Sequence, residues 1–195
     1  MKIIQWVIIC VCAWILTACI DIKIAQDVDK VSYFNLQNTI QTKATCKAYK
    51  KLALLDIHAI APYDNTNIYL LDSKNLQIST LETKKWISSP KNMLKNTLIL
   101  KAQEQCFEVS IPPFGTQKLD KTLKISLLAL QIVQSNSTYK AQIQIFYEIF
   151  SLKNHQSKSG TLESSISLES LTDSSLALGF VKASDEVFTQ LLKKL

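Results

Sequence analysis

The sequence predicts a single α+β domain in which a mostly antiparallel mixed sheet is packed by two main helices. Two long β-type runs, 123–133 and 139–150, follow each other closely, and the second alternates apolar and polar residues strictly. A helix start at Ser89-Pro90 and an apolar stripe within residues 172–194 predict the two helices. The part of the chain that carries these signals has the length of one ordinary domain.

Shorter strand signals lie before, between and after these elements. The chain is expected to form further strands at 31–36, 52–60, 68–71, 76–80, 106–111 and 162–168. Residues 72–75 are turn formers (Asp, Ser, Lys, Asn), which predicts a hairpin between the third and fourth of these strands. Residues 38–51 are polar and predict a loop. The strand at 52–60 is expected to end at Ala61-Pro62.

Both helices have recognisable boundaries. Ser89 is suited to cap the first helix, Pro90 suits its first position, and the helix is expected to end near Gln105. The second helix carries its apolar residues on one stripe: Leu176, Phe180, Ala183, Val187, Leu191 and Leu195.

The N-terminus has the pattern of an export signal. Lys2 precedes an almost unbroken apolar run, 3–16, which ends in Leu16-Thr17-Ala18-Cys19. Small residues directly before a cysteine look like the lipobox of bacterial lipoproteins, in which the cysteine is acylated after cleavage. We therefore expect a signal peptide at 1–18, a lipid-anchored tether at 19–30 and the folded domain at 31–195. An uncleaved membrane anchor is the alternative, because the uncharged stretch is near the lower length limit of a spanning helix.

The residue after the lipidated cysteine bears on which membrane holds the protein. Ile20 follows Cys19, and Asp21 comes one position later. In many Gram-negative bacteria an aspartate directly after the cysteine retains a lipoprotein in the inner membrane. We therefore expect anchoring at the periplasmic face of the outer membrane, with the inner membrane as the alternative.

Removal of the signal peptide and acylation leave two cysteines in the folded domain. Cys10 and Cys12 leave with it and Cys19 is acylated, so Cys46 and Cys106 remain in a compartment that permits disulfides. We expect these two residues to form a disulfide. The alternative is two buried free thiols, which behave as small hydrophobic side chains.

Several function classes find no support in the composition. All 22 basic residues are lysines, and the absence of arginine argues against nucleic-acid recognition. The histidines, His58 and His155, do not stand at metal-ligand spacing from each other or from a cysteine. Asp56 shares a strand face with His58, but nothing selects a serine to complete a triad. We expect no enzyme activity, no metal and no cofactor.

Short motifs along the domain resemble a known family. They are Tyr33-Phe34-Asn35-Leu36, Pro62-Tyr63, Ile68-Tyr69-Leu70-Leu71, Trp86 followed by Ser89-Pro90-Lys91-Asn92-Met93-Leu94, and Phe107-x-Val109. In this order, between about residues 31 and 192, the chain resembles the auxiliary lipoproteins of ABC-type intermembrane lipid transport systems, the PqiC-like family. Members of that family often carry an arginine near the hairpin, which this chain lacks.

The resemblance implies a non-catalytic periplasmic lipoprotein that docks or receives lipid at the outer membrane. Its partners would be an MCE-domain protein and the ABC permease and ATPase of the same system, and a homo-oligomer is compatible with this role. Trp86 is a candidate partner contact, against the alternative that it belongs to the core. The competing functions are a lipid-anchored binding protein for a small apolar ligand and a structural envelope lipoprotein.

The lipid anchor can be tested at the cysteine itself. The Cys19→Ala variant should lose acylation and signal-peptide cleavage, because the thiol that carries the lipid is gone. Metabolic labelling with a fatty acid and the mass of the mature protein measure both steps. Normal processing and unchanged membrane retention of Cys19→Ala would contradict the lipoprotein assignment.

Overall fold

The computed structural model describes residues 30–37 and 45–195. The predicted signal peptide, Cys19 and most of the tether therefore lie outside the described residues. The elements are, in chain order, β1 (Ser32–Phe34), β2 (Lys50–Ala59), β3 (Asn67–Asp72), β4 (Gln77–Trp86), α2 (Pro90–Glu104), β5 (Phe107–Ser110), β6 (Lys121–Ser135), β7 (Thr138–Ser151), β8 (Ser157–Leu168) and α3 (Asp173–Leu192). None of the helices in this described part is long and apolar enough to cross a membrane.

The sheet is built around β6, which has partners along both edges. On one edge β7 pairs antiparallel with its full length, and β8 follows β7 in the same manner. The other edge is shared, because β2 pairs parallel with residues 121–127 and β3 pairs parallel with residues 131–134. Strand β5 then extends the β2 side, while β4 and β1 extend the β3 side. The result is the predicted mixed sheet, with eight strands.

A β-bulge in β6 lies where the partner on its shared edge changes. The register against β7 shifts between Leu127 and Ala129, so the residue between them, Leu128, points away from the core and is 43% exposed. Before the bulge, the alternate residues Leu123, Ile125 and Leu127 are buried in the core. After it, Leu130 and Ile132 are buried. The extra residue keeps a long apolar run facing the core while the strand bends.

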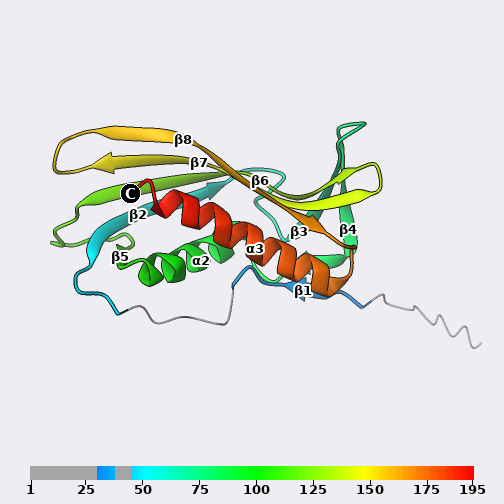
Figure 1. The fold of residues 1–195 in the computed structure, drawn as a ribbon, viewed down its shortest axis with the longest axis horizontal. Coiled ribbons are helices and arrows are strands. Elements are labelled where there is room, and N and C mark those ends of the chain that lie inside the picture. The colour runs from blue at the N-terminus through cyan, green and yellow to red at the C-terminus, as the bar shows by residue number, and fades with distance from the viewer. Residues whose placement is uncertain (1–29, 38–44) are drawn as a thin grey trace, which may run out of the picture.

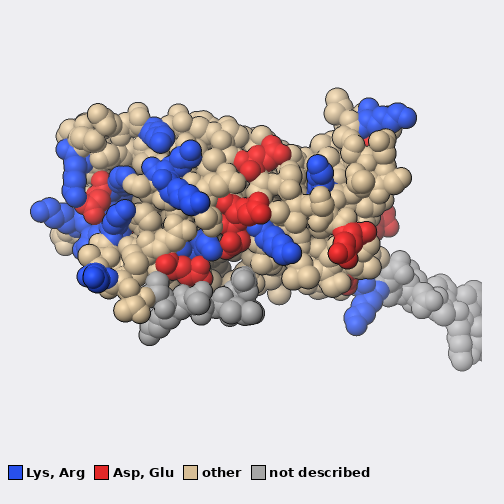
Figure 2. Space-filling model, in the orientation of Figure 1, with Lys and Arg blue, Asp and Glu red and all other residues tan. Residues whose placement is uncertain are grey.

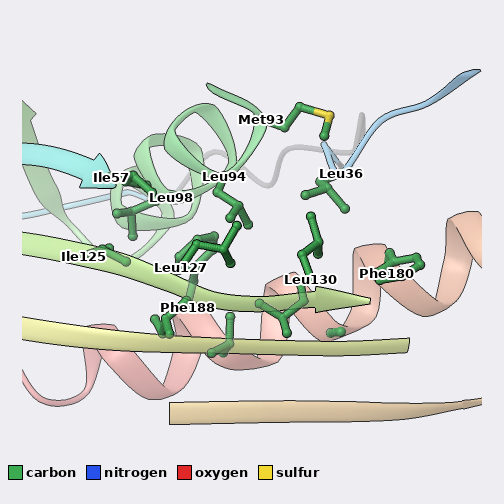
Figure 3. Close-up of a cluster of buried hydrophobic side chains, with 14 of the residues drawn as sticks. Leu36, Ile57, Met93, Leu94, Leu98, Ile125, Leu127, Leu130, Phe180 and Phe188 are labelled. Carbon is green, nitrogen blue, oxygen red and sulfur yellow. The ribbon is translucent and has the colours of Figure 1, made fainter. Parts of the chain in front are cut away.

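Both helices lie along one face of the sheet (Figure 1). Helix α3 packs on β7 and β8, and α2 packs on β2, β5 and α3. Apolar side chains from both layers meet between them, with Leu94 and Leu98 of α2 and Phe188 of α3 directed toward Leu127 and Leu130 of β6 (Figure 3). The predicted α+β class is therefore confirmed.

Trp86 belongs to this core, so the prediction that it contacts a partner is wrong. Its side chain is 1% exposed, and its ring meets that of Phe180 edge to face, with 4.9 Å between centroids. The tryptophan is the last residue of β4 and faces the beginning of α3 across the layer boundary. Packing of an aromatic side chain between helix and sheet leaves no surface for a second protein.

Three local expectations need correction. Ser89 is the N-cap of α2, but its hydroxyl is buried and finds no hydrogen-bond partner among the described residues, so it does not cap the helix through its side chain. Strands β4 and β8 are longer than predicted, because their added residues are mostly polar and carry no hydrophobic alternation. Lys50 and Lys51, expected in a loop, open strand β2.

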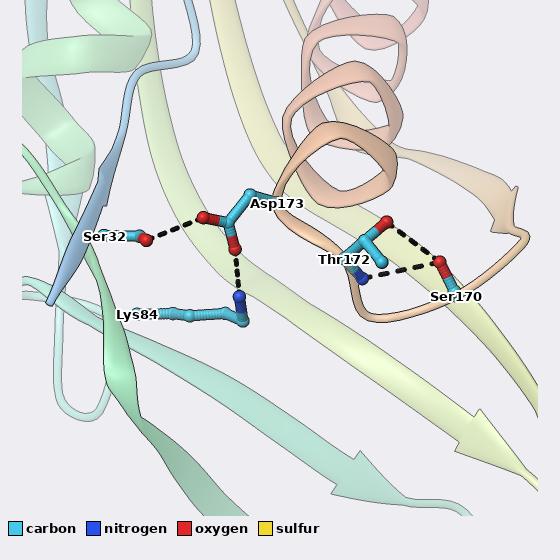
Figure 4. A network of polar contacts seen from close by, with 5 residues as sticks. All are labelled: Ser32, Lys84, Ser170, Thr172 and Asp173. Carbon is cyan, nitrogen blue, oxygen red and sulfur yellow. Dashed lines mark hydrogen bonds and ion pairs between the residues drawn. The ribbon is translucent and has the colours of Figure 1, made fainter. Parts of the chain in front are cut away.

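A polar contact fastens the beginning of α3 to the first strand. The Ser32 hydroxyl donates to Asp173 Oδ2 at 2.6 Å, and Lys84 of β4 forms an ion pair with the same carboxylate (Figure 4). The hydrogen bond from Lys84, followed by that from Ser32, lowers the pKa of Asp173 below its ordinary value. An acidic residue in the first turn also matches the positive end of the helix dipole. This contact joins β1, β4 and α3 at one end of the molecule.

Cys46 and Cys106 form a disulfide, with 5.6 Å between their Cα atoms. The bond links the segment before β2 to the residue directly before β5. Next to it, the backbone N–H of Lys50 donates to the Cys106 carbonyl at 3.0 Å. The start of β2 is therefore attached to the start of β5 both covalently and by the backbone.

The core assignment predicts very different effects for two residues of α3. Phe180→Ala should destabilise the fold by about 3–5 kcal/mol, because it removes a buried ring beneath Trp86 and leaves a cavity. Leu178→Ala, two positions earlier, should change stability by no more than about 0.5 kcal/mol, because Leu178 is 61% exposed. Urea denaturation of both variants measures the difference. Equal losses of stability would contradict the packing of α3 described above.

The disulfide predicts a separate stability effect. Its two cysteines are 60 residues apart, so the chain-entropy model gives about 4 kcal/mol of stabilisation. A peptide linked through Cys46 and Cys106 should be found by mass spectrometry of unreduced protein, and the Cys46→Ala/Cys106→Ala variant should unfold at lower denaturant. Full alkylation of both thiols in the native protein would refute the bond.

Candidate functional site

The polar residues that could have suggested catalysis lie at exposed positions. Asp56 and His58 are both exposed on β2, and Asp56 Oδ1 accepts a hydrogen bond from the backbone N–H of Ile57 at 2.8 Å. His155 lies in the exposed turn between β7 and β8. Within residues 30–37 and 45–195, no three histidine, cysteine or acidic side chains converge as metal ligands.

The sheet face opposite the helices carries a ladder of polar side chains. Tyr63 donates to the Gln131 side chain, Gln131 Nε2 donates to Gln142 Oε1 at 2.9 Å, and Gln142 Nε2 donates to Glu163 Oε1 at 2.9 Å. Burial, followed by the charge of Tyr69, raises the pKa of Tyr63. The ladder crosses β6, β7 and β8, and its hydrogen bonds stabilise this face of the sheet.

A pocket of about 280 Å³ opens at the end of the sheet where both helices end. Its apolar floor consists of Leu52, Phe107 and Leu195. Around this floor stand four lysines and one carboxylate: Lys50, Lys51, Lys121, Lys153 and Asp120. We call this feature the lysine-rimmed pocket.

Strand register brings these residues together from distant parts of the chain. Lys50 pairs with Phe107 across β2 and β5, and Leu52 pairs with Lys121 across β2 and β6. Lys121 pairs in turn with Ser151 of β7, which also lines the pocket. These residues therefore form a row across four neighbouring strands.

The floor of the pocket is the edge of the hydrophobic core. Side chains two apart on a strand share a face, so Leu52 and Lys121 lie on the same face as the buried Leu54 and Leu123. Helix α3 ends at Leu192, and the residues after it reach Lys121, whose Nζ donates to the main-chain oxygen of Leu195. The sheet continues past the helical layer, and this overhang creates the hollow.

The lysines differ in how they are held. Lys50 Nζ lies 5.3 Å from the centroid of the Phe107 ring, a cation–π distance. Lys153 Nζ is 2.8 Å from Asp120 Oδ1, whereas Lys50 and Lys51 belong to no ion pair in the described part of the chain. The hydrogen bond from Lys153, followed by that from the Lys51 backbone, lowers the pKa of Asp120. With four lysines against one carboxylate, the rim is cationic.

Figure 2 shows lysines gathered at the same end of the molecule. In the sequence, the pair Lys50-Lys51 belongs to a polar segment that predicts a loop. No local pattern could have joined it to Lys121, Lys153 and Leu195, because the strand register that brings them together spans most of the domain.

Comparison with known proteins finds similarity at the level of the fold. No known family model matches the sequence, and no curated protein matches it. Among solved structures, a Xanthomonas campestris protein of the DUF330 family has a TM-score of 0.68 and 14% identity, covering 83% of this chain and 92% of that chain. A second structure, described as an uncharacterized protein, has a TM-score of 0.67 and 12% identity, covering 85% and 98%.

A lipoprotein from Neisseria meningitidis, GNA1162, is much less similar, with a TM-score of 0.39, 8% identity and coverage of 74% and 99%. A likeness that weak carries no argument about this chain. The two stronger matches are sufficient for the architecture, since each is spanned over nearly its whole length. The chain thus shares the fold of DUF330 proteins, which are the PqiC-like family.

Proposed function

We propose that this protein is a non-catalytic periplasmic lipoprotein subunit of an ABC/MCE-type intermembrane lipid transport system. It acts as a docking or receiving component at the outer membrane, beside an MCE-domain protein and the permease and ATPase of the same system. The observation that carries the proposal is the DUF330 fold, found in a chain whose motifs resemble the PqiC-like family. The lipobox-like Leu16-Thr17-Ala18-Cys19 supports the envelope location.

The position at which the chain enters the domain supports a docking role. The described chain begins at Lys30, just before β1. Strand β5 and the C-terminal end of the chain, which contribute to the lysine-rimmed pocket, lie toward the opposite end of the long axis (Figure 1). A tether of about 12 residues reaches at most roughly 40 Å. A domain held by this tether can therefore turn its far end away from the anchoring membrane, toward a partner that crosses most of the periplasm.

A second function is favoured by the pocket itself. A lipid-anchored protein that binds a small amphiphilic ligand on its own would need an apolar floor and a few polar groups, and the lysine-rimmed pocket has both. This alternative needs no transporter. The two functions predict different results for double deletions, because an independent binding protein would act in a pathway separate from the transporter.

Genetic interaction separates the two functions. Deleting the gene should sensitise the envelope to detergent as much as deleting the neighbouring MCE and permease genes does, and the double deletion should be no worse. Growth in graded detergent measures the effect, and complementation with the wild-type gene is the control. Crosslinking in membranes should recover the MCE protein. Clearly additive defects, together with no MCE protein among the crosslinked partners, would favour the independent binding protein.

A further inference from the structure

We propose that the lysine-rimmed pocket binds the headgroup and first methylene groups of a single-chain anionic amphiphile, such as a lysophospholipid with an exposed phosphate. This inference deepens the proposed function and rests on it for the source of the lipid. The binding itself is argued from the contacts of the pocket.

The floor of the pocket offers a place for methylene groups. Leu52 is 1% exposed and Phe107 is 5% exposed, so the surface they present is the end of the packed core. Leu195 adds a third apolar wall from the segment after α3. Methylene groups lying here would leave water and contact these apolar side chains, which favours binding.

The rim offers a place for a negative headgroup. Lys50 is held above the Phe107 ring, so its ammonium group stands directly beside the apolar floor. Lys121 lies on the same face of the sheet, paired with Leu52 across β2 and β6, whereas Lys51 points to the other face, where its charge acts on Asp120. Two cations next to apolar surface are complementary to a molecule that is anionic at one end and apolar beyond it.

The volume limits how much of the ligand can enter. Pockets for drug-sized ligands enclose roughly 300–1,000 Å³, and this one has about 280 Å³ and is open to solvent. It is too small for both chains of a diacyl lipid. A headgroup with the beginning of one acyl chain fits, and the rest of the chain would extend along the surface or remain in a partner.

Photocrosslinking can test the pocket in the full mature protein. The lipidated protein would be placed in phosphatidylcholine nanodiscs and exposed to two photoactivatable probes, a lysophosphatidic acid and the matching lysophosphatidylcholine. The anionic probe should label peptides of β2, β5 and β6 around the pocket about tenfold more than the zwitterionic probe, because only it leaves its charge free for lysine. Inorganic phosphate at the probe's own concentration should not compete, because it has no chain for the floor.

Variants that lose the same charge inside and outside the pocket test whether the lysines of the pocket are responsible for the labelling. Lys50→Gln/Lys121→Gln should lower labelling by the anionic probe about tenfold. Lys74→Gln/Lys140→Gln removes the same charge from exposed lysines of the β3–β4 turn and of β7, and should change labelling less than about twofold. Ser151→Phe should block labelling by filling the pocket, and circular dichroism shows whether that variant folds. If it does not fold, the two lysine pairs decide the question.

Three results would overturn the proposal: equal labelling by both probes, labelling outside the pocket, or an equal loss in the two lysine pairs. Competition by equimolar phosphate would also overturn it, by assigning the pocket to a free anion. These failures are distinct from failure of the transport role, which is measured by additivity in cells. The binding proposal can be refuted while the genetic interaction is confirmed, and the genetic interaction can be refuted while binding is confirmed.

Discussion

The backbone pairing of β6 on both of its edges is the interaction on which the rest of the structure depends. This strand of 15 residues pairs with β7 on one side, apart from the bulged Leu128, and with β2 and then β3 on the other. A central strand paired on both edges has its backbone donors and acceptors satisfied inside the sheet. Because β2 and β3 belong to the first half of the chain and β7 to the second, this one strand unites the two halves.

The division of the shared edge has consequences for both ends of the molecule. The bulge near Leu128 bends β6 where β2 gives way to β3, so the sheet spreads into two arms. At the β3 arm, β4 carries Trp86 under α3, and Asp173 attaches the helix to Ser32 and Lys84. At the β2 arm, α2 and α3 end before the sheet does, which leaves the lysine-rimmed pocket uncovered.

The exclusive use of lysine fits a site that does not select its ligand by shape. An ammonium group acts as a point charge, whereas the guanidinium group of arginine imposes a planar, bidentate geometry. All basic residues of this chain are lysines, including the four around the pocket. A rim of point charges attracts anionic headgroups of several kinds, and the apolar floor adds the requirement for a chain. Both properties suit the proposed binding of a single-chain anionic amphiphile.

The sequence by itself determined the local elements, and only the tertiary structure decided how they combine. Strict alternation in β7, the Pro90 start of α2 and the apolar stripe of α3 were readable because periodicity and caps act within a few residues. The contact of Trp86 with Phe180, the sharing of β6 by β2 and β3, and the pocket were not readable. Lys50, Lys121 and Leu195 meet only through strand register and helix length, which are fixed by packing across the whole domain.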